Sequence, residues 1–316
     1  MTDSQDSPLV SVIMNAHNSE KFLAEALESV IAQTYTNWEV ILWDNASTDG
    51  SESIAAACGD DRIRYFAIPD KVSLYESRMN AFLQTRGELV AFLDCDDIWD
   101  SRKLELQVPI FVDPRCVVSS TDYFVLRESV QPDWGWRRCE RITGSYSEPV
   151  NSIFELITNY RIGMSTVMAR HDVARKIWPC PPPAYSMIED LDMTARLLNG
   201  GWLFSIAEPL TSYRLHGSNY SLNSELHEPE WQDWLDGLQN LGISYDEAET
   251  ARCAIEGRRI RGKCNEALMA GHRWKCLSLL SQMTISVDTL KYGAAAMVPT
   301  RVFRAVVNRK RPGDLQ

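Results

Sequence analysis

Residues 9–97 alternate between short apolar runs and segments with helical periodicity, and this alternation constrains the fold more than any other feature of the chain. The expected strands are residues 9–14, 38–43, 62–67 and 88–93, with helical patterns between them. Consecutive strands joined by helices form parallel pairs, because a parallel pair needs a long crossover connection. The sequence therefore predicts an α/β fold with a mainly parallel sheet flanked by helices.

The helix before the fourth strand carries clear boundary signals. Ser73 and Glu76 form an S-x-x-E capping box, in which each side chain satisfies a backbone donor of the first turn. Gly87 stands where a glycine would end this helix. Arg78 is expected to lie on this helix.

The fourth strand ends in three carboxylates, Asp94, Asp96 and Asp97. Carboxylates this close raise one another's pKa unless a cation lies among them. A hard divalent cation binds oxygen ligands and can leave positions open for phosphate, and ligands of open α/β sheets bind beyond the carboxyl ends of strands. Two interpretations are open from these residues alone: a metal site, or an acidic turn that caps the next helix.

Composition narrows the class of protein. The chain has 316 residues, 45% hydrophobic and 24% charged, as in ordinary globular proteins, and no run of eighteen apolar residues. Its polar start, residues 1–8, is expected to be a disordered tail rather than a secretory signal. Eight cysteines without a C-x-x-C pair suggest reduced thiols in the cytoplasm, and the net charge of −11 disfavours nucleic-acid partners.

The second half of the chain has a less regular pattern. Residues 116–126 predict a long strand, 127–150 a loop, and 202–206 and 210–214 two short strands. Beyond residue 222 only helical patterns occur. Residues 301–316 hold five basic side chains against one acidic one, and an amphipathic basic helix there is expected to contact an anionic membrane. The alternative is a terminal helix packed on the domain.

Four segments together resemble family 2 glycosyltransferases of the GT-A fold: residues 10–18, 33–35, 40–50 and 94–97. Their order and spacing match that family over roughly residues 8–220. The resemblance implies a Rossmann-like GT-A nucleotide-diphospho-sugar transferase domain over residues 9–222. Its nucleotide-binding half would be about 9–115 and its acceptor half about 116–222. Residues 223–316, which the resemblance does not cover, are expected to form an α-helical C-terminal extension.

The resemblance implies a metal-dependent, inverting transfer of a sugar from a nucleotide-diphosphate donor to a hydroxyl acceptor. A divalent metal, Mn or Mg, would stabilise the departing diphosphate. Asp96 is the expected metal ligand, and Asp94 would lie toward the ribose and the outer shell of the metal. Asp97 would be a second ligand or an outer-shell partner. His216 would complete the metal shell, touch the diphosphate, or serve only the structure.

The resemblance also places nucleotide contacts at the ends of the first two strands, at Asn15, His17, Asp44 and Asn45. The family often has tyrosine at the His17 position and aspartate at the Asn45 position, so the identity of the base is open. Arg78 resembles the family's basic residue near the base and phosphates. A solvated surface arginine is the alternative for Arg78.

Glu189 and Asp190 open a predicted helix and resemble the catalytic E-D pair of the family. Asp190 is the candidate general base, and a positioned base contributes about 10²- to 10⁴-fold to the rate. The helix N-terminus should favour its ionised form. The alternative is that these acids have no catalytic role and stand at a helix start because acids are favoured there in any protein.

The sequence leaves two alternatives to a glycosyltransferase open. A nucleotidyltransferase uses a similar sheet, but it normally has a glycine-rich phosphate loop after the first strand, and residues 15–18 here contain no glycine. A non-catalytic sugar-binding module is the other alternative. For the enzyme, the acceptor would be a saccharide or a lipid-linked saccharide of bacterial cell-surface polysaccharide or glycoconjugate synthesis. The expected location is the cytoplasm, at the inner face of the membrane if the basic helix binds there.

Overall fold

The computed structural model describes residues 7–128, 136–178, 185, 187–217, 219, 224–270 and 272–280. The chain divides into two compact units, Met1–Leu241 and Gly242–Gln316. Most of the predicted disordered tail and all of the basic segment 301–316 lie outside the described residues.

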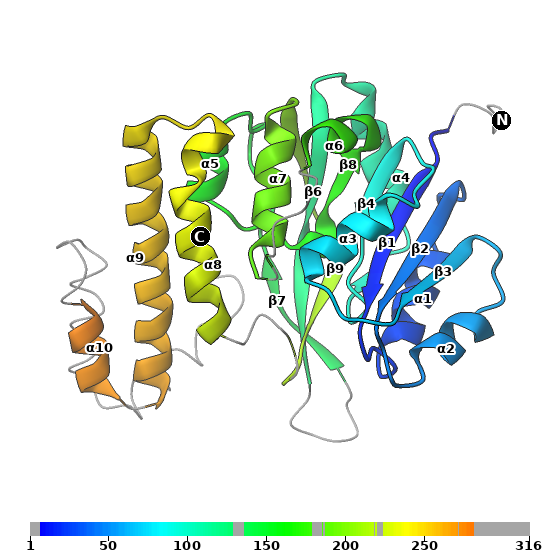
Figure 1. Ribbon diagram of the computed structural model, residues 1–316, viewed down its shortest axis with the longest axis horizontal. Coiled ribbons are helices and arrows are strands. Elements are labelled where there is room, and N and C mark those ends of the chain that lie inside the picture. Colours follow the sequence, from blue (N-terminus) through cyan, green and yellow to red (C-terminus); the bar gives the residue numbers. More distant parts are fainter. Residues whose placement is uncertain are drawn as a thin grey trace. The chain divides into compact units, whose positions relative to one another are not determined.

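The first half of unit 1 is the predicted parallel sheet (Figure 1). Its strands are β1 (Val10–Ala16), β2 (Trp38–Asn45), β3 (Ile63–Ile68) and β4 (Leu89–Phe92), in the spatial order β3-β2-β1-β4. Helices α1 (Leu23–Ile31), α2 (Ser51–Ala57) and α3 (Leu74–Phe82) connect them. All four strands run in the same direction, so their carboxyl ends meet at one edge of the sheet.

The sheet continues into the second half of unit 1 through antiparallel neighbours. Strand β8 (Met168–Arg170) joins β4 to β6 (Cys116–Glu128), and β9 (Trp202–Leu215) runs parallel to β6. Strands β5 (Ile98–Trp99) and β7 (Trp136–Ile142) pair with β9 and β6. The remaining helices of the unit are α4 (Lys103–Gln107), η1 (Val108–Val112), α5 (Ile153–Thr158), η3 (Met164–Thr166), α6 (His171–Ile177), α7 (Glu189–Leu198), α8 (Ser224–Asp236) and η5 (Leu238–Leu241).

Two sequence-based expectations for this half are wrong. The predicted loop 127–150 contains β7, which is rich in charged residues and therefore lacks the apolar pattern of a strand. The two short strands predicted at 202–206 and 210–214 are one strand, β9. The pairing of β9 with β6 shifts between Ile206 and Pro209, so the irregularity in the sequence marks a bulge rather than an end.

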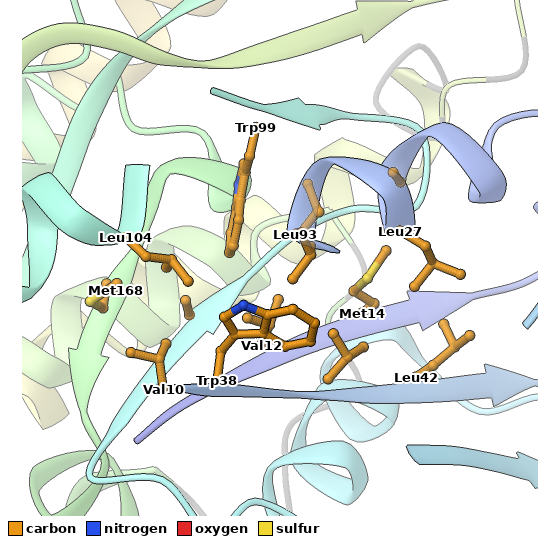
Figure 2. Packing of buried hydrophobic residues seen from close by; sticks show 14 of the residues in the cluster. Val10, Val12, Met14, Leu27, Trp38, Leu42, Leu93, Trp99, Leu104 and Met168 are labelled. Atoms are coloured by element: carbon orange, nitrogen blue, oxygen red, sulfur yellow. The ribbon is translucent and has the colours of Figure 1, made fainter. Parts of the chain in front are cut away.

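A buried apolar cluster packs β1, β2 and α1 together and extends to Trp99, Leu104 and Met168 (Figure 2). Alternate residues of β1 enter it, as the two-residue period of a strand requires: Val10, Val12, Met14 and Ala16. The intervening Ser11 and Ile13 are also fully buried, so β1 is covered on both faces. Burial contributes about 1.5–3 kcal/mol for each large apolar side chain. The ends of β1 and β2, which carry predicted site residues, follow directly from this packed core.

The predicted cap of α3 is confirmed, whereas Gly87 has another role. The Ser73 side chain accepts a hydrogen bond from the Glu76 backbone N–H at the start of α3. The helix ends at Phe82, before Gly87. A Cβ atom on Gly87 would lie 2.5 Å from the Leu9 carbonyl oxygen. Gly87 therefore allows the chain entering β4 to approach β1 closely.

Unit 2 consists of helices in its described part. These are α9 (Tyr245–Ala270) and α10 (Arg273–Leu280), which pack against each other. Helical structure is as the sequence predicts for this part of the extension. Among the helices that the structure describes, none is both long and apolar enough to cross a membrane.

Candidate active site

The carboxyl edge of the parallel strands gathers most of the predicted site residues. Ala16 of β1 pairs with Asp44 of β2, and Ile13 pairs with Phe92 of β4. The residues that follow β4 therefore emerge beside the end of β1. Side-chain contacts then divide the site into an acidic part after β4 and at the start of α7, and a polar part at the ends of β1 and β2.

The Asp97 carboxylate is hydrogen-bonded within the protein. Its carboxylate is buried; Oδ1 accepts a hydrogen bond from the Arg214 backbone N–H at 2.9 Å, and Oδ2 accepts one from Ser165 Oγ at 2.5 Å. The Asp94 backbone N–H donates to the same Ser165 Oγ at 3.1 Å. Ser165 of η3 thus fixes both ends of the acidic turn. Asp97 is placed as a support of the site, with each carboxylate oxygen engaged by the protein.

Asp94 and Asp96 keep part of their surface exposed, 34% and 29% of the side chain. Asp96 Oδ2 lies 3.0 Å from His216 Nε2 and 3.3 Å from Asn219 Nδ2. Burial and the nearby Asp94 charge raise the pKa of Asp96, which His216 partly opposes. His216 and Asp96 therefore come together as predicted, with β9 supplying the histidine just beyond its end.

Arg78 joins the two acidic segments. This buried guanidinium places Nη2 2.8 Å from Asp94 Oδ1 and 3.3 Å from Glu189 Oε1. Arg78 is not the solvated surface residue that the sequence left open. A single cation from α3 thus holds an acid at the end of β4 and an acid at the start of α7 within one site.

Asp190 lies next to this bridge on α7. Its Oδ1 accepts a hydrogen bond from the Leu191 backbone N–H at 2.7 Å. Burial raises the pKa of Asp190 to about 6 and the pKa of Glu189 to about 8. Burial is the largest cause, and the Leu191 N–H at the helix start opposes it, as the N-terminus of a helix should. A carboxylate with a pKa near neutrality suits a general base.

The polar part of the site is held by loop contacts. Asp44 is buried and accepts hydrogen bonds from Ser47 N–H and the Tyr65 hydroxyl, both at 2.7 Å. The Asn45 amide pairs with both backbone groups of Val72: its Nδ2 donates to the Val72 oxygen at 3.0 Å, and its Oδ1 accepts from the Val72 N–H at 2.9 Å. Both side chains, predicted as nucleotide contacts, are occupied by protein partners.

His17 and Asn15 flank these loop contacts. His17 is exposed, and its ring Nδ1 donates to the Asn45 backbone oxygen at 2.8 Å. Asn15 Nδ2 donates to Ser77 Oγ at 2.8 Å, next to Arg78 on α3. Of the predicted base contacts, the imidazole of His17 is therefore the side chain most open to a ligand.

Sequence reasoning missed two residues that organise the acidic part. Ser165 carries no motif and is distant in sequence from the residues it binds, so no local signal marks it. Asn219 lies just after the segment of His216; its side chain also accepts from the His216 backbone N–H at 2.5 Å and donates to the Arg214 oxygen at 3.0 Å. Its position three residues after His216, a predicted site residue, was the available signal.

The described residues contain no group of three or more His, Cys, Asp or Glu side chains already arranged to hold a metal ion. The donor chemistry nevertheless suits a hard divalent cation. Asp94 and Asp96 offer partly exposed carboxylate oxygens whose mutual repulsion a cation would relieve. Burial raises the pKa of the intervening Cys95 thiol, which donates to the Asn15 oxygen and is a poor ligand for such an ion.

Comparison with known proteins gives consistent matches. The family model described as glycosyl transferase family 2 matches residues 11–170. The chain is 30% identical over 220 residues to the putative teichuronic acid biosynthesis glycosyltransferase TuaG of Bacillus subtilis, covering 68% of this chain and 82% of that protein. It is 29% identical over 164 residues to the UDP-Glc:alpha-D-GlcNAc-diphosphoundecaprenol beta-1,3-glucosyltransferase WfgD of Escherichia coli, covering 52% of this chain and 60% of that protein.

Solved structures show the same fold. S. aureus TarS 1-349 in complex with UDP-GlcNAc superposes with a TM-score of 0.61 at 16% identity, covering 90% of this chain and 81% of that chain. The mannosyltransferase PcManGT from Pyrobaculum calidifontis in complex with GDP-Man and Mn2+ gives a TM-score of 0.58 at 14% identity, covering 97% and 88%. These likenesses confirm the predicted GT-A α/β fold.

Proposed function

The chain belongs to glycosyl transferase family 2, and from this premise we propose that it is a metal-dependent, inverting glycosyltransferase of bacterial surface-polysaccharide synthesis. Membership of this family makes the chain a glycosyltransferase that uses a nucleotide-sugar donor. It also removes the reason to prefer a nucleotidyltransferase. The metal, the stereochemical course and the residue roles are the proposal.

The Arg78 bridge is the observation that carries the proposal. It brings the acids after β4 and the acids opening α7 to one place, through contacts of 2.8 Å and 3.3 Å. Metal-binding acids and a catalytic base must lie within one donor–acceptor complex to act on the same bond. Isolated acidic turns, the alternative for each segment, have no need to share a buried cation.

The roles follow from the contacts. Asp96 and Asp94 would hold a Mn or Mg ion, which supplies neutralisation of charge on the departing diphosphate when it is bound. His216 and Asn219 orient Asp96, and Asp97 fixes the turn that carries it. We therefore propose that His216 positions the Asp96 carboxylate. The contacts give less support to His216 or Asp97 as a direct ligand of the metal.

Asp190 is proposed to take the proton of the acceptor hydroxyl. The hydroxyl oxygen then attacks the anomeric carbon on the face opposite the nucleotide diphosphate, which leaves with the electrons of the broken bond. Inversion follows from this single displacement. Glu189, held by Arg78, keeps the start of α7 in place for this proton transfer.

The relatives support the proposed substrates. WfgD is named for transfer from UDP-Glc to a diphosphoundecaprenol-linked sugar, and TuaG for teichuronic acid biosynthesis. A nucleotide-diphosphate sugar donor and a saccharide or lipid-linked acceptor are therefore proposed for this chain. A lipid-linked acceptor would make contact of the basic segment 301–316 with the cytoplasmic face of the membrane useful.

The test is a donor assay combined with product analysis. Purified protein is incubated with UDP-, GDP- and dTDP-sugars, with Mn2+, Mg2+ or a chelator, and with saccharide and lipid-linked acceptors. We expect one donor to be turned over only with metal, and the anomeric configuration measured by NMR to be inverted. Full turnover in the chelator would refute the metal role, and a retained configuration would refute inversion.

A further inference from the structure

Tyr160 presents a buried polar group that the proposed mechanism has not used. It follows α5, which packs against α7. Its hydroxyl oxygen is buried, and among the described residues it has no hydrogen-bond partner of acceptable geometry. A buried hydroxyl without a partner is unfavourable and calls for an explanation, such as a catalytic role.

The surroundings of this hydroxyl point to Asp190. The phenol lies close enough to Asp190 to oppose the rise in the pKa of the carboxyl, and burial together with the Asp190 charge raises the pKa of the phenol. Thr194 lies on the same side, and its hydroxyl donates to the Asp190 backbone oxygen at 2.7 Å. The Tyr160 hydroxyl therefore faces the candidate base without a well-formed hydrogen bond to it.

We propose that Tyr160 is a positioning residue for Asp190, whose phenolic hydrogen completes a hydrogen bond to the carboxylate when the acceptor binds. This inference rests on the proposed function. The Leu191 N–H already holds one carboxylate oxygen at 2.7 Å. A second donor from α5 would fix the carboxylate at two points and direct the remaining lone pairs at the acceptor hydroxyl. Catalytic hydrogen bonds are often poorly aligned before the substrate arrives.

Other groups also act on Asp190, and they define what the test must hold constant. Glu189 on the same helix and Asp94 after β4 are acidic neighbours, and Arg78 of α3 is the cationic one. Helix α6 and strand β6 also pack against α7. None of their described residues is among the main causes of the pKa shift of Asp190. Removing the Tyr160 hydroxyl leaves all of these charges in place.

The experiment is the pH profile of kcat, measured at saturating donor and acceptor, for Tyr160→Phe, because kcat reports the pKa of the base in the substrate-bound enzyme. A donor to the ionised form lowers the pKa of a carboxyl, so its loss should move the acid limb to higher pH by about one unit. Activity should fall several-fold near pH 6 and approach that of the wild type at pH 8. Incorporating 3-fluorotyrosine at position 160 keeps the size, strengthens the donor, and should move the limb the opposite way.

Tyr75→Phe is the matched control. The Tyr75 hydroxyl is also buried without a partner of acceptable geometry among the described residues, but it faces Asp192 and Arg196 of α7. This variant should leave the acid limb in place. An equal loss of activity at all pH values in Tyr160→Phe, no movement with 3-fluorotyrosine, or the same shift in Tyr75→Phe would each overturn the inference.

Failure of the proposed function would look different. In that case the wild type would show no turnover of any donor, or Asp190→Asn would retain full activity. An active wild type and an inactive Asp190→Asn, combined with an unmoved acid limb in Tyr160→Phe, would instead reject the role of Tyr160 alone.

Discussion

The two acidic segments of the site, one after β4 and one opening α7, are built in the same way. Each contains one acid whose carboxylate oxygens are both bound by other groups of the protein. Asp97 is occupied by Ser165 and Arg214, and Asp192 is occupied by Trp234 Nε1 at 2.9 Å and Arg196 Nε at 2.7 Å. Of the neighbouring acids, Asp94 and Glu189 share Arg78, and Asp96 and Asp190 are the ones proposed to act most directly on ligands.

The segments differ in how the remaining acids are treated. Asp94 and Asp96 are both partly exposed and lie one residue apart, whereas Glu189 is buried against Arg78 and Asp190 beside it is half-buried; burial raises their pKa values to about 8 and about 6. A pair of partly exposed carboxylates suits a hydrated cation, and a carboxylate with a pKa near neutrality suits proton transfer. If the proposed roles hold, similar runs of acids serve different chemistry because their neighbours differ, and four experiments can break or sharpen this contrast.

The largest effect is expected for Asp96→Ala. Loss of the principal ligand should abolish metal-dependent turnover of the donor, since the charge of the departing diphosphate is no longer neutralised. The measurement is the initial rate with saturating Mn2+, together with circular dichroism to show that the fold survives. Full activity in this folded variant would refute the assignment of the segment after β4 to metal.

Asp190→Asn should retain nucleotide binding and lose about 10²- to 10⁴-fold in kcat, the usual contribution of a positioned base. Asparagine keeps the size of the side chain and cannot accept the proton. The measurement is steady-state kinetics alongside calorimetric binding of the nucleoside diphosphate with Mn2+. A loss of binding with unchanged kcat would place Asp190 with the metal acids and remove the contrast between the segments.

Asp192→Asn tests the acid of α7 that is bound by Trp234 and Arg196 and is expected to serve stability rather than catalysis. It should lower the free energy of unfolding by about 3 kcal/mol, the lower end for breaking a buried ion pair because Arg196 is partly exposed. Urea denaturation measures this change. The folded variant should turn over donor at a rate close to that of the wild type, in contrast to Asp190→Asn.

The pH dependence gives the smallest effect. Burial raises the pKa of Asp190 to about 6, so the base is ionised above that pH and increasingly protonated below it. The value of kcat/KM should therefore be level above about pH 7 and fall about tenfold per pH unit below pH 6. A profile that stays level down to pH 4 would show that Asp190 is not the base.

Much of the first half of the chain could be predicted because its signals are local. Apolar periodicity marked β1 to β4, and Ser73 with Glu76 marked the start of α3. The charged strand β7 and the bulged strand β9 were not recognised, because both owe their conformation to pairing with β6. Strand pairing between distant segments overrides local preference.

The chemistry of individual side chains was less predictable than their position. Asn45 stands where the resemblance places a base contact, yet its amide is engaged by Val72, 27 residues away. Ser165 was not predicted at all, and it holds the turn from Asp94 to Asp97 from 68 residues beyond Asp97. Such contacts have no local signature.

The sequence by itself determined the order of the first four strands and the helices between them, the family, and which acids stand at the end of β4 and the start of α7. These depend on periodicity, caps and motifs within short stretches of chain. Only the tertiary structure decided which acids are partly exposed and which are hydrogen-bonded within the protein. It also decided that Arg78 joins the two segments. Burial and pairing set the charge state of a carboxylate, and both arise from residues that are distant in sequence.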